Sequence, residues 1–291
     1  MVKLVSRFAP VIFVLLWSTG FVGAKYILPY AEPFVFLTIR YALATLFLIG
    51  IAALLREPMR LTKGQVIQSI KVGLFLQVIY IGGVFYAVHL GVSAGVTSVV
   101  VSTQPILVSI LAVRFLNEPL GLRKIIGLLL GFSGVMLLLL PKVFSGNFAL
   151  QFSRSGVIAA VIALIGTTTG YLLQKKGGTD VPFLPGTAVQ FAIATLLFSI
   201  AAIATETWSV KVTSQFLLAL GWIVIALSIG SIFLLFYLLK HDSASSVSSL
   251  YYLVPPLTAI QAYILFGEVI TIVGLIGMGL AALGTLLVTK K

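Results

Sequence analysis

The chain has 291 residues, of which 60% are hydrophobic and 9% are charged, and its mean hydropathy is +1.17. Soluble domains carry roughly 25% charged residues, so this composition excludes a soluble globular protein and indicates a polytopic membrane protein. The net charge of +12 comes without a basic cluster interleaved with aromatic residues, which argues against nucleic-acid binding, and the absence of cysteine excludes a disulfide framework and thiolate catalysis.

Ten apolar segments follow one another along the chain, each bounded by charges, proline or glycine. They lie near residues 9–28, 34–55, 67–88, 94–116, 122–140, 155–175, 185–205, 215–239, 244–266 and 270–288. Each can cross a bilayer as a helix, and we expect the first to be an uncleaved span because no signal-peptide cleavage pattern precedes it. The predicted fold is therefore an all-α integral membrane protein with ten transmembrane helices and no soluble domain.

Basic residues predict the orientation of these spans. If the N-terminus is cytoplasmic, 13 Lys and Arg residues flank the inner ends of the spans and 4 flank the outer ends. Arg40 and Lys71, which lie within predicted spans, complete the 19. The positive-inside rule then places both termini in the cytoplasm of a bacterial-type inner membrane.

One stretch of the chain returns in altered form 150 residues later. Residues 94–118 and residues 244–268 both carry small polar residues early, a proline in the middle and a carboxylate at the end. The matched residues are Pro105 with Pro255 and Glu118 with Glu268. A proline in mid-span removes a backbone donor and favours a kink, which membranes tolerate where protein or a wet cavity satisfies the freed carbonyl. We therefore expect the two segments to face each other across a central pathway.

The repeat extends over the whole chain. At the same offset, residues 18–21 (STGF) match residues 168–171 (TTGY), and Lys25 matches Lys175. These matches divide the chain into two halves, residues 1–145 and residues 146–291, with five predicted spans in each. Because five is odd, the second half must be inverted relative to the first. Inverted repeats place a binding site at their interface near mid-membrane and permit alternating access.

Several short motifs link this architecture to a known family. They are Trp17-Ser18-Thr19-Gly20-Phe21, Leu116-Asn117-Glu118-Pro119 followed by Gly127, Gly131 and Gly134, and Phe266-Gly267-Glu268. With ten spans in two halves, the chain resembles the drug/metabolite transporter superfamily of the EamA type, and within it the YddG-type exporters of amino acids, aromatic ones especially. The motifs are specific for the fold and weak for the substrate. The resemblance implies an inner-membrane exporter.

A polar stripe on the fourth predicted span is one candidate site. Its residues fall at i, i+4, i+7 and i+11 and so share one helix face: Ser98, Ser102, Pro105 and Ser109. Their repeat mates are Ser248, Tyr252, Pro255 and Ala259. Cavity lining and close helix packing explain the serines equally well, whereas Tyr252 is too bulky for a tight helix contact and favours a cavity.

Further candidates lie in the middle of other spans. Trp17 is far from the interfaces where tryptophan usually gathers, so it either stacks on a ligand or packs in the core. Gln77 and Tyr80 lie one turn apart on the third span, and a mid-span amide needs partners, which favours a polar cavity. The weaker candidates are Tyr171, Gln104, Gln190 and Gln261.

The charged residues of the spans have ordinary explanations. Arg40 is expected to extend outward to the membrane surface, with capture of a substrate carboxylate as the alternative. Lys25 and Lys175 are expected to be interface anchors. Glu118 and Glu268 are expected to cap helices or pair with loops. Glycines at 127, 131 and 277 are expected to form packing faces that join either the two halves or two protomers.

Enzymatic chemistry has little support. His89 and His241 have no companion at metal-ligand spacing, and no phosphate-binding, zinc-protease or serine-hydrolase motif occurs. We therefore expect no enzyme activity, metal or cofactor.

The sequence predicts a monomeric or homodimeric transporter that exports amino acids or related metabolites by alternating access between its halves. The predicted substrate-binding residues are Trp17, Gln77, Tyr80, Ser98, Ser102, Tyr171 and Tyr252. The alternatives are a multidrug cation exporter, a sugar-phosphate or nucleotide-sugar exchanger, and a membrane-embedded enzyme. Because all seven acidic residues fall in loops or at span ends, we expect a facilitator or substrate-coupled exchanger instead of a proton antiporter.

Overall fold

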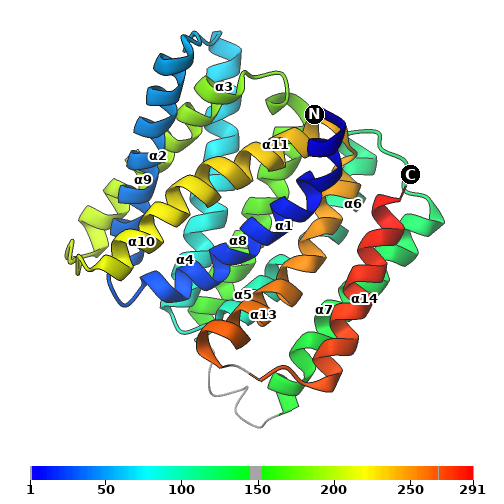
Figure 1. The fold of residues 1–291 in the computed structure, drawn as a ribbon. Coiled ribbons are helices and arrows are strands. Elements are labelled where there is room, and N and C mark those ends of the chain that lie inside the picture. Colours follow the sequence, from blue (N-terminus) through cyan, green and yellow to red (C-terminus); the bar gives the residue numbers. More distant parts are fainter. Residues whose placement is uncertain (1, 145–152, 268, 291) are drawn as a thin grey trace.

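The computed structural model describes residues 2–144, 153–267 and 269–290, and these residues form a bundle of helices (Figure 1). The helices of the first half are α1 (Val2–Ile27), α2 (Pro33–Leu55), α3 (Lys63–Val72), α4 (Gly82–His89), α5 (Ala94–Val101), α6 (Gln104–Phe115) and α7 (Leu122–Phe144). Those of the second half are α8 (Arg154–Leu173), α9 (Phe183–Thr205), α10 (Ser214–Trp222), α11 (Ile232–His241), α12 (Ala244–Ser249), α13 (Val254–Phe266) and α14 (Ile272–Thr289).

Four short segments of different helical type interrupt or extend these helices. The π-helix η1 (Gly73–Ile81) joins α3 to α4, and the π-helix η3 (Ile223–Ser231) joins α10 to α11. The π-helix η2 (Gln174–Gly178) follows α8, and the 3₁₀ helix η4 (Leu250–Leu253) joins α12 to α13. The described residues form no β-strand and only one isolated β-bridge, between Ala31 and Val210, so the all-helical class is confirmed.

Eight helical segments of the described chain are long and apolar enough to cross a membrane. They are Phe8–Ile27, Pro33–Leu55, Lys63–His89, Val96–Phe115, Arg154–Gly178, Phe183–Thr205, Ser214–His241 and Ile272–Thr289. The two other expected spans, near 122–140 and 244–266, are also helical; the first is α7, and the second is divided into α12, η4 and α13. The polytopic membrane architecture is therefore confirmed.

The central prolines break their helices as their positions predict. α5 ends at Val101, and α6 begins at Gln104 with Pro105 in its first turn, where a missing N–H costs nothing. In the second half, η4 occupies the corresponding place, and Pro255 lies in the first turn of α13. The two breaks thus recur 150 residues apart, although one is a short turn and the other a 3₁₀ helix.

The π-helices η1 and η3 also recur at this offset, since both the first and the last residues of these nine-residue segments differ by 150. A π-helix closes its hydrogen bonds one residue later than an α-helix and is frequently found at functional sites. Nothing in the sequence analysis anticipated these segments. They matter here because both contribute side chains to the central cavity described below.

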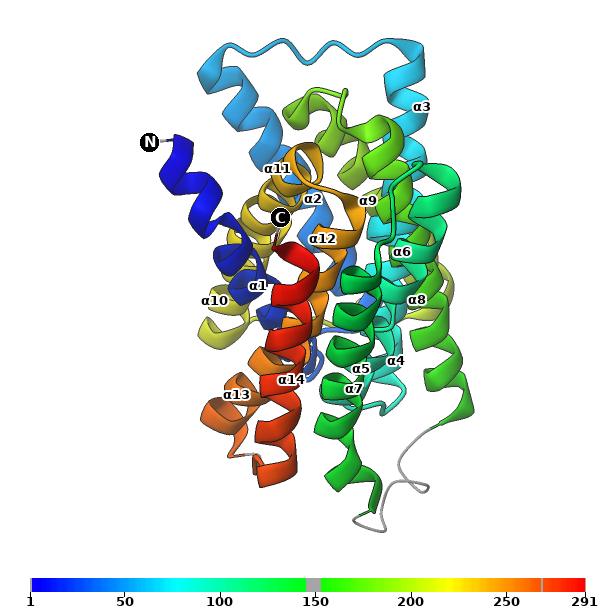
Figure 2. The same ribbon diagram turned by 90° about the vertical axis from the view of Figure 1, so that its right-hand side faces the viewer.

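The two halves pack through small residues where their helices run side by side. α7 lies along α14 at one edge of the bundle (Figures 1 and 2). A Cβ atom on Gly134 would lie 2.5 Å from the carbonyl oxygen of Gly277, and a Cβ atom on Gly284 would lie 2.5 Å from that of Gly127. The predicted glycine faces therefore join the two halves of the chain. α2 packs against α9 at the opposite edge.

Candidate functional site

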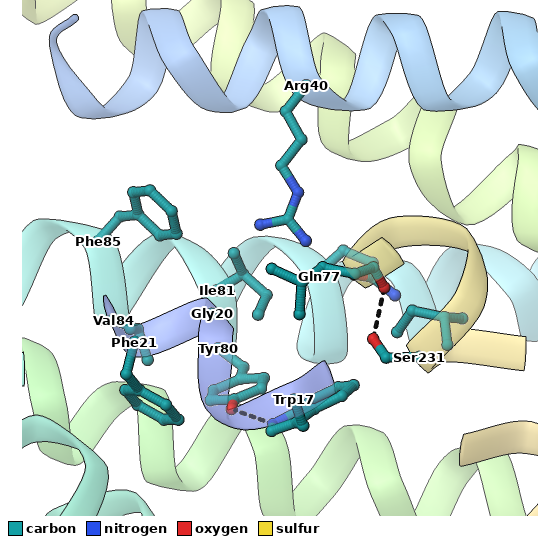
Figure 3. A pocket seen from close by; sticks show the side chains of 12 residues that line it. Trp17, Gly20, Phe21, Arg40, Gln77, Tyr80, Ile81, Val84, Phe85 and Ser231 are labelled. Atoms are coloured by element: carbon teal, nitrogen blue, oxygen red, sulfur yellow. Dashed lines mark hydrogen bonds between the residues drawn. The ribbon is translucent and has the colours of Figure 1, made fainter. Parts of the chain in front are cut away.

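A small cavity lies between the two halves, with walls from α1, α2, η1, α4, η3 and α11 (Figure 3). Its volume is about 30 Å³, which is room for about one water molecule. The lining residues are Trp17, Gly20, Phe21, Arg40, Gln77, Tyr80, Ile81, Val84, Phe85, Leu227, Ser231 and Ile232. The cavity therefore combines an apolar wall with a few polar side chains, as small-molecule sites do.

Arg40 supplies the charge in this cavity. Its side chain is 6% exposed, and its Nε donates a hydrogen bond of 2.8 Å to Ser228 Oγ. The guanidinium carbon lies 5.0 Å from the centroid of the Tyr41 ring. The expected extension to the membrane surface is therefore wrong. The reason is helix position: Phe36, Arg40 and Ala44 share one face of α2, and that face is fully packed against the bundle.

Arg40 has no acidic counterpart in the described part of the chain. None of the 12 lining residues is acidic, and no carboxylate described here lies within ion-pairing distance of the guanidinium. The described acidic residues lie in loops or at helix ends, as expected, and are Glu32, Glu57, Glu118, Asp180, Glu206 and Asp242. An unpaired buried charge in a membrane is costly and usually functional, so this cavity suits an anionic ligand group.

Trp17 and Tyr80 form one wall of the cavity. Trp17 Nε1 donates a hydrogen bond of 3.2 Å to the Tyr80 hydroxyl, and the two rings are stacked with an interplanar angle of 11° (Figure 3). The ring centroids of Tyr251 and Trp17 lie 5.6 Å apart, and those of Tyr171 and Tyr251 lie 6.1 Å apart, both pairs in an edge-on arrangement. The structure thus brings Trp17 and Tyr80 to the cavity and places Tyr171 behind them.

Gln77 is the third predicted residue that lines the cavity. Its Oε1 accepts a hydrogen bond of 3.0 Å from the Tyr41 hydroxyl, while its Nε2 is buried and has no partner. Ser231, on η3, donates to the Leu227 carbonyl oxygen at 2.5 Å. The amide of Gln77 therefore keeps an unused donor group in the cavity wall.

The remaining predicted site residues do not reach this cavity. Ser102 Oγ donates to the carbonyl oxygens of Ser98 and Tyr251, at 2.7 and 3.2 Å, so both serines lie in a helix contact. Tyr252 packs in a separate apolar cluster with its ring against Gly131 of α7. The prediction that Tyr252 shares a cavity with Trp17 is therefore corrected.

Tyr251, the neighbour of Tyr252 in η4, is the tyrosine whose ring contacts Trp17, although it does not line the cavity. The repeat match with Ser102 selected Tyr252, and a 3₁₀ helix turns by a larger angle per residue than an α-helix, so the face of each tyrosine differs from that expected of a continuous α-helix. No signal in the sequence distinguishes them, because the 3₁₀ turn is not visible in the composition.

Carboxylates close the bundle at both ends of the cavity. At one end Glu206 accepts hydrogen bonds from the backbone N–H groups of Phe34 and Val35, at 2.9 and 2.7 Å. In the same region Glu32 accepts from Thr207 N at 2.9 Å. At the other end Glu118 Oε1 accepts from Ala244 N at 2.7 Å. All three contacts link the halves; those of Glu206 and Glu118 satisfy the N-termini of α2 and α12, and that of Glu32 satisfies the loop after α9.

The expected role of Glu118 in helix capping is thereby confirmed, whereas Glu268 lies outside the described residues. Lys175 is also engaged in the protein: its Nζ donates to the carbonyl oxygens of Leu239 and Asp242, both at 2.6 Å. This cation stabilises the C-terminal end of α11, so Lys175 is a helix cap where an interface anchor was expected. Among the described residues no group of three or more potential ligands could hold a metal ion.

Comparison with known families agrees with this arrangement. The model of the EamA-like transporter family matches residues 8–140 and, a second time, residues 154–290. The chain belongs to the EamA-like transporter family. As an EamA-like transporter it is a membrane protein built from two repeats, and its cavity lies between them.

The chain is also similar to uncharacterized transporters over nearly their whole length. The chain is 27% identical to the uncharacterized transporter YvbV of Bacillus subtilis, over 96% of this chain and 89% of the relative. It is 28% identical to an uncharacterized transporter of Archaeoglobus fulgidus, over 94% of this chain and 95% of the relative. A crystal structure with 20% identity superimposes with a TM-score of 0.79, over 97% of this chain and 95% of that chain, and supports the fold alone.

Proposed function

We propose that this protein is an inner-membrane secondary transporter that exports amino acids and related small metabolites by alternating access. The observation that carries the proposal is Arg40, a buried cation that lines a central cavity without an acidic counterpart among the described residues. A substrate carboxylate would supply the missing negative charge. The aromatic surface of Trp17, Tyr80 and Phe85 would hold the substrate side chain.

The proposed architecture has ten transmembrane helices, arranged as two inverted five-helix repeats in residues 1–145 and 146–291. Support comes from the breaks at the central prolines and from η1 and η3, which all recur at one offset. An odd number of spans in each repeat requires inversion, and a site between inverted repeats is the usual arrangement in alternating-access transporters.

The proposed binding residues are Trp17, Gln77, Tyr80 and Arg40, with Tyr171 as a supporting residue. Ser98, Ser102 and Tyr252 are proposed to act in helix packing and to meet substrate only if the pathway widens. A cavity of about 30 Å³ is too small for an amino acid, so binding requires the helices that form its walls to separate.

Two other transporter functions fit less well. A multidrug cation exporter needs an acidic group in the pathway, and the lining of the cavity contains none. A sugar-phosphate or nucleotide-sugar exchanger would also use Arg40, but strong phosphate recognition usually uses several cations, and Arg40 is the single basic residue of the lining.

Transport by the purified protein tests this proposal. Proteoliposomes are loaded with buffer and given radiolabelled phenylalanine, tryptophan or leucine without a pH gradient or membrane potential. We expect downhill uptake that exceeds that of protein-free liposomes, because the described acidic residues all lie outside the cavity and no proton carrier is in place. Uptake that appears only with an imposed proton gradient would contradict the facilitator mechanism. Absence of uptake for every amino acid would contradict the substrate class.

A further inference from the structure

The polar groups of the central cavity are mostly donors. Arg40 has five N–H groups, and Nε uses one of them on Ser228. Gln77 Nε2 has two more and no partner, while Gln77 Oε1 already accepts from Tyr41. Figure 3 shows the guanidinium extending from α2 toward Gln77. These two side chains together present a cluster of N–H groups to the cavity.

The acceptors of the cavity are few and neutral. They are the hydroxyl oxygens of Tyr80, which accepts a hydrogen bond from Trp17, and of Ser231, which donates its proton to Leu227 and keeps its lone pairs, together with Gln77 Oε1. The other lining residues are glycine or apolar residues. A ligand carboxylate thus finds two sets of donors, whereas a ligand ammonium group finds no carboxylate in the lining.

An ammonium group would also be placed close to a like charge. In an α-amino acid the ammonium group is on the carbon next to the carboxylate, so a carboxylate bound by Arg40 brings the ammonium close to the guanidinium, and repulsion between like charges is strong where water is excluded. Cation–π attraction to the aromatic wall could offset part of this cost, but an aromatic ring supplies no full negative charge to balance a second cation beside Arg40.

We propose that the site selects a net-negative monocarboxylate with an aromatic or apolar body over the zwitterionic amino acid of the same shape. This inference rests on the proposed transport function and, among amino acids and related small metabolites, favours the carboxylates that lack the ammonium group. Arg40 and Gln77 bind the carboxylate, and the apolar wall of Phe21, Val84 and Phe85 receives the body of the molecule. The missing acidic partner is what disfavours the ammonium group.

Three ligands that share a phenyl ring on a two-carbon chain and differ in the charged groups attached to that chain test the charge preference directly. 3-Phenylpropanoate carries only the carboxylate, L-phenylalanine carries both charged groups, and 2-phenylethylamine carries only the ammonium. Their affinities for the purified wild-type protein in lipid nanodiscs are measured by isothermal titration calorimetry at pH 7. We expect phenylpropanoate to bind at least tenfold more tightly than phenylalanine, and phenylethylamine to show no binding.

The outcomes separate this inference from the proposed function. If phenylalanine binds as tightly as phenylpropanoate or more tightly, the charge preference is wrong while amino-acid transport stands. If phenylethylamine binds most tightly, both are wrong, and a cation exporter is favoured. If none of the three binds, an aromatic carboxylate is not the ligand, and the inference is overturned.

Variants of Arg40 assign the preference to this residue. Arg40→Gln should remove the preference, so that phenylpropanoate and phenylalanine bind equally weakly, and Arg40→Lys should keep it. Arg60→Gln, which changes an exposed arginine in the loop after α2, serves as the matched control and should keep the wild-type ratio. An unchanged ratio in Arg40→Gln would contradict the assignment. If Arg40→Gln does not fold, the ranking of the three ligands on the wild type still decides.

Discussion

A buried arginine in a membrane protein must obtain its stabilisation from inside the fold. Arg40 has one hydrogen bond from Nε and one aromatic ring near its guanidinium, which leaves most of its N–H groups available. A guanidinium is also hard to deprotonate, so neutralisation does not relieve its burial. This is why a ligand anion is a better explanation than a structural role, in which partners are normally complete.

Trp17 tests the role of the aromatic wall. Trp17→Ala should lower uptake of aromatic substrates by at least tenfold and affect aliphatic ones less, because stacking area is lost only for ring-bearing ligands. Uptake of phenylalanine and leucine into proteoliposomes measures the difference, with the thermal unfolding midpoint as the check on folding. Equal loss for both substrates together with a lower midpoint would show that Trp17 acts in core packing.

At the residue scale, a mid-span polar or aromatic side chain needs a partner, and that argument selected Trp17, Gln77 and Tyr80, which all line the cavity; that they bind substrate stays a prediction. The direction of Arg40 was predicted wrongly, because the direction of a long side chain depends on which face of α2 is covered. The same reasoning did not separate Tyr252, which packs against Gly131, from its neighbour Tyr251, which contacts Trp17.

At the level of helices, the contact between α7 and α14 depends on residues without side chains. Backbone atoms of the two helices approach each other at Gly134, where an added Cβ would lie 2.4 Å from Ala281 N and 2.5 Å from the carbonyl oxygen of Gly277. Such close approach gives strong van der Waals contact, which is a main source of helix association in lipid. The spacing of glycines was visible in the sequence; the identity of the partner helix was not.

Gly134→Ala should therefore destabilise the protein, since the backbone of α14 cannot yield without moving the helix. We expect a loss of about 1–3 kcal/mol, typical of overpacked contacts. Gly279→Ala on α14 is the matched control, because a Cβ there meets nothing within 4 Å. Thermal unfolding in detergent compares the two. Equal midpoints for the two variants would show that the close contact can relax.

On the scale of the whole molecule, hydropathy and charge determine most of what the sequence reveals. The ten predicted segments are helical, because long apolar runs have few alternatives in a bilayer, and most bounds agree within a few residues, although α1 begins at Val2 and not near residue 9. The central prolines predicted breaks in two of the segments, but the π-helices and the 3₁₀ form of the break between α12 and α13 were not predicted, since they depend on packing between segments far apart in the chain. Composition carries no information on such contacts.

The orientation of the molecule is open to a direct experiment. The chain has no cysteine, so single cysteines can be added without removing others. Lys211→Cys, in an exposed loop predicted to lie outside, should react with a membrane-impermeant maleimide on intact cells. Arg60→Cys, in an exposed loop predicted to lie inside, should react only after permeabilisation. The reverse pattern would show that the termini face the outside.

The carboxylate contacts at the two ends of the bundle have a consequence for how the protein can evolve. Glu118 and Glu206 accept hydrogen bonds from backbone N–H groups of Ala244, Phe34 and Val35, and every residue except proline supplies such a group. These hydrogen bonds therefore place no requirement on the side chains at positions 34, 35 and 244, which are constrained only by packing, since Val35 and Ala244 are fully buried. Covariation between sequences, which detects matched side chains, would not reveal these carboxylate contacts between the two halves.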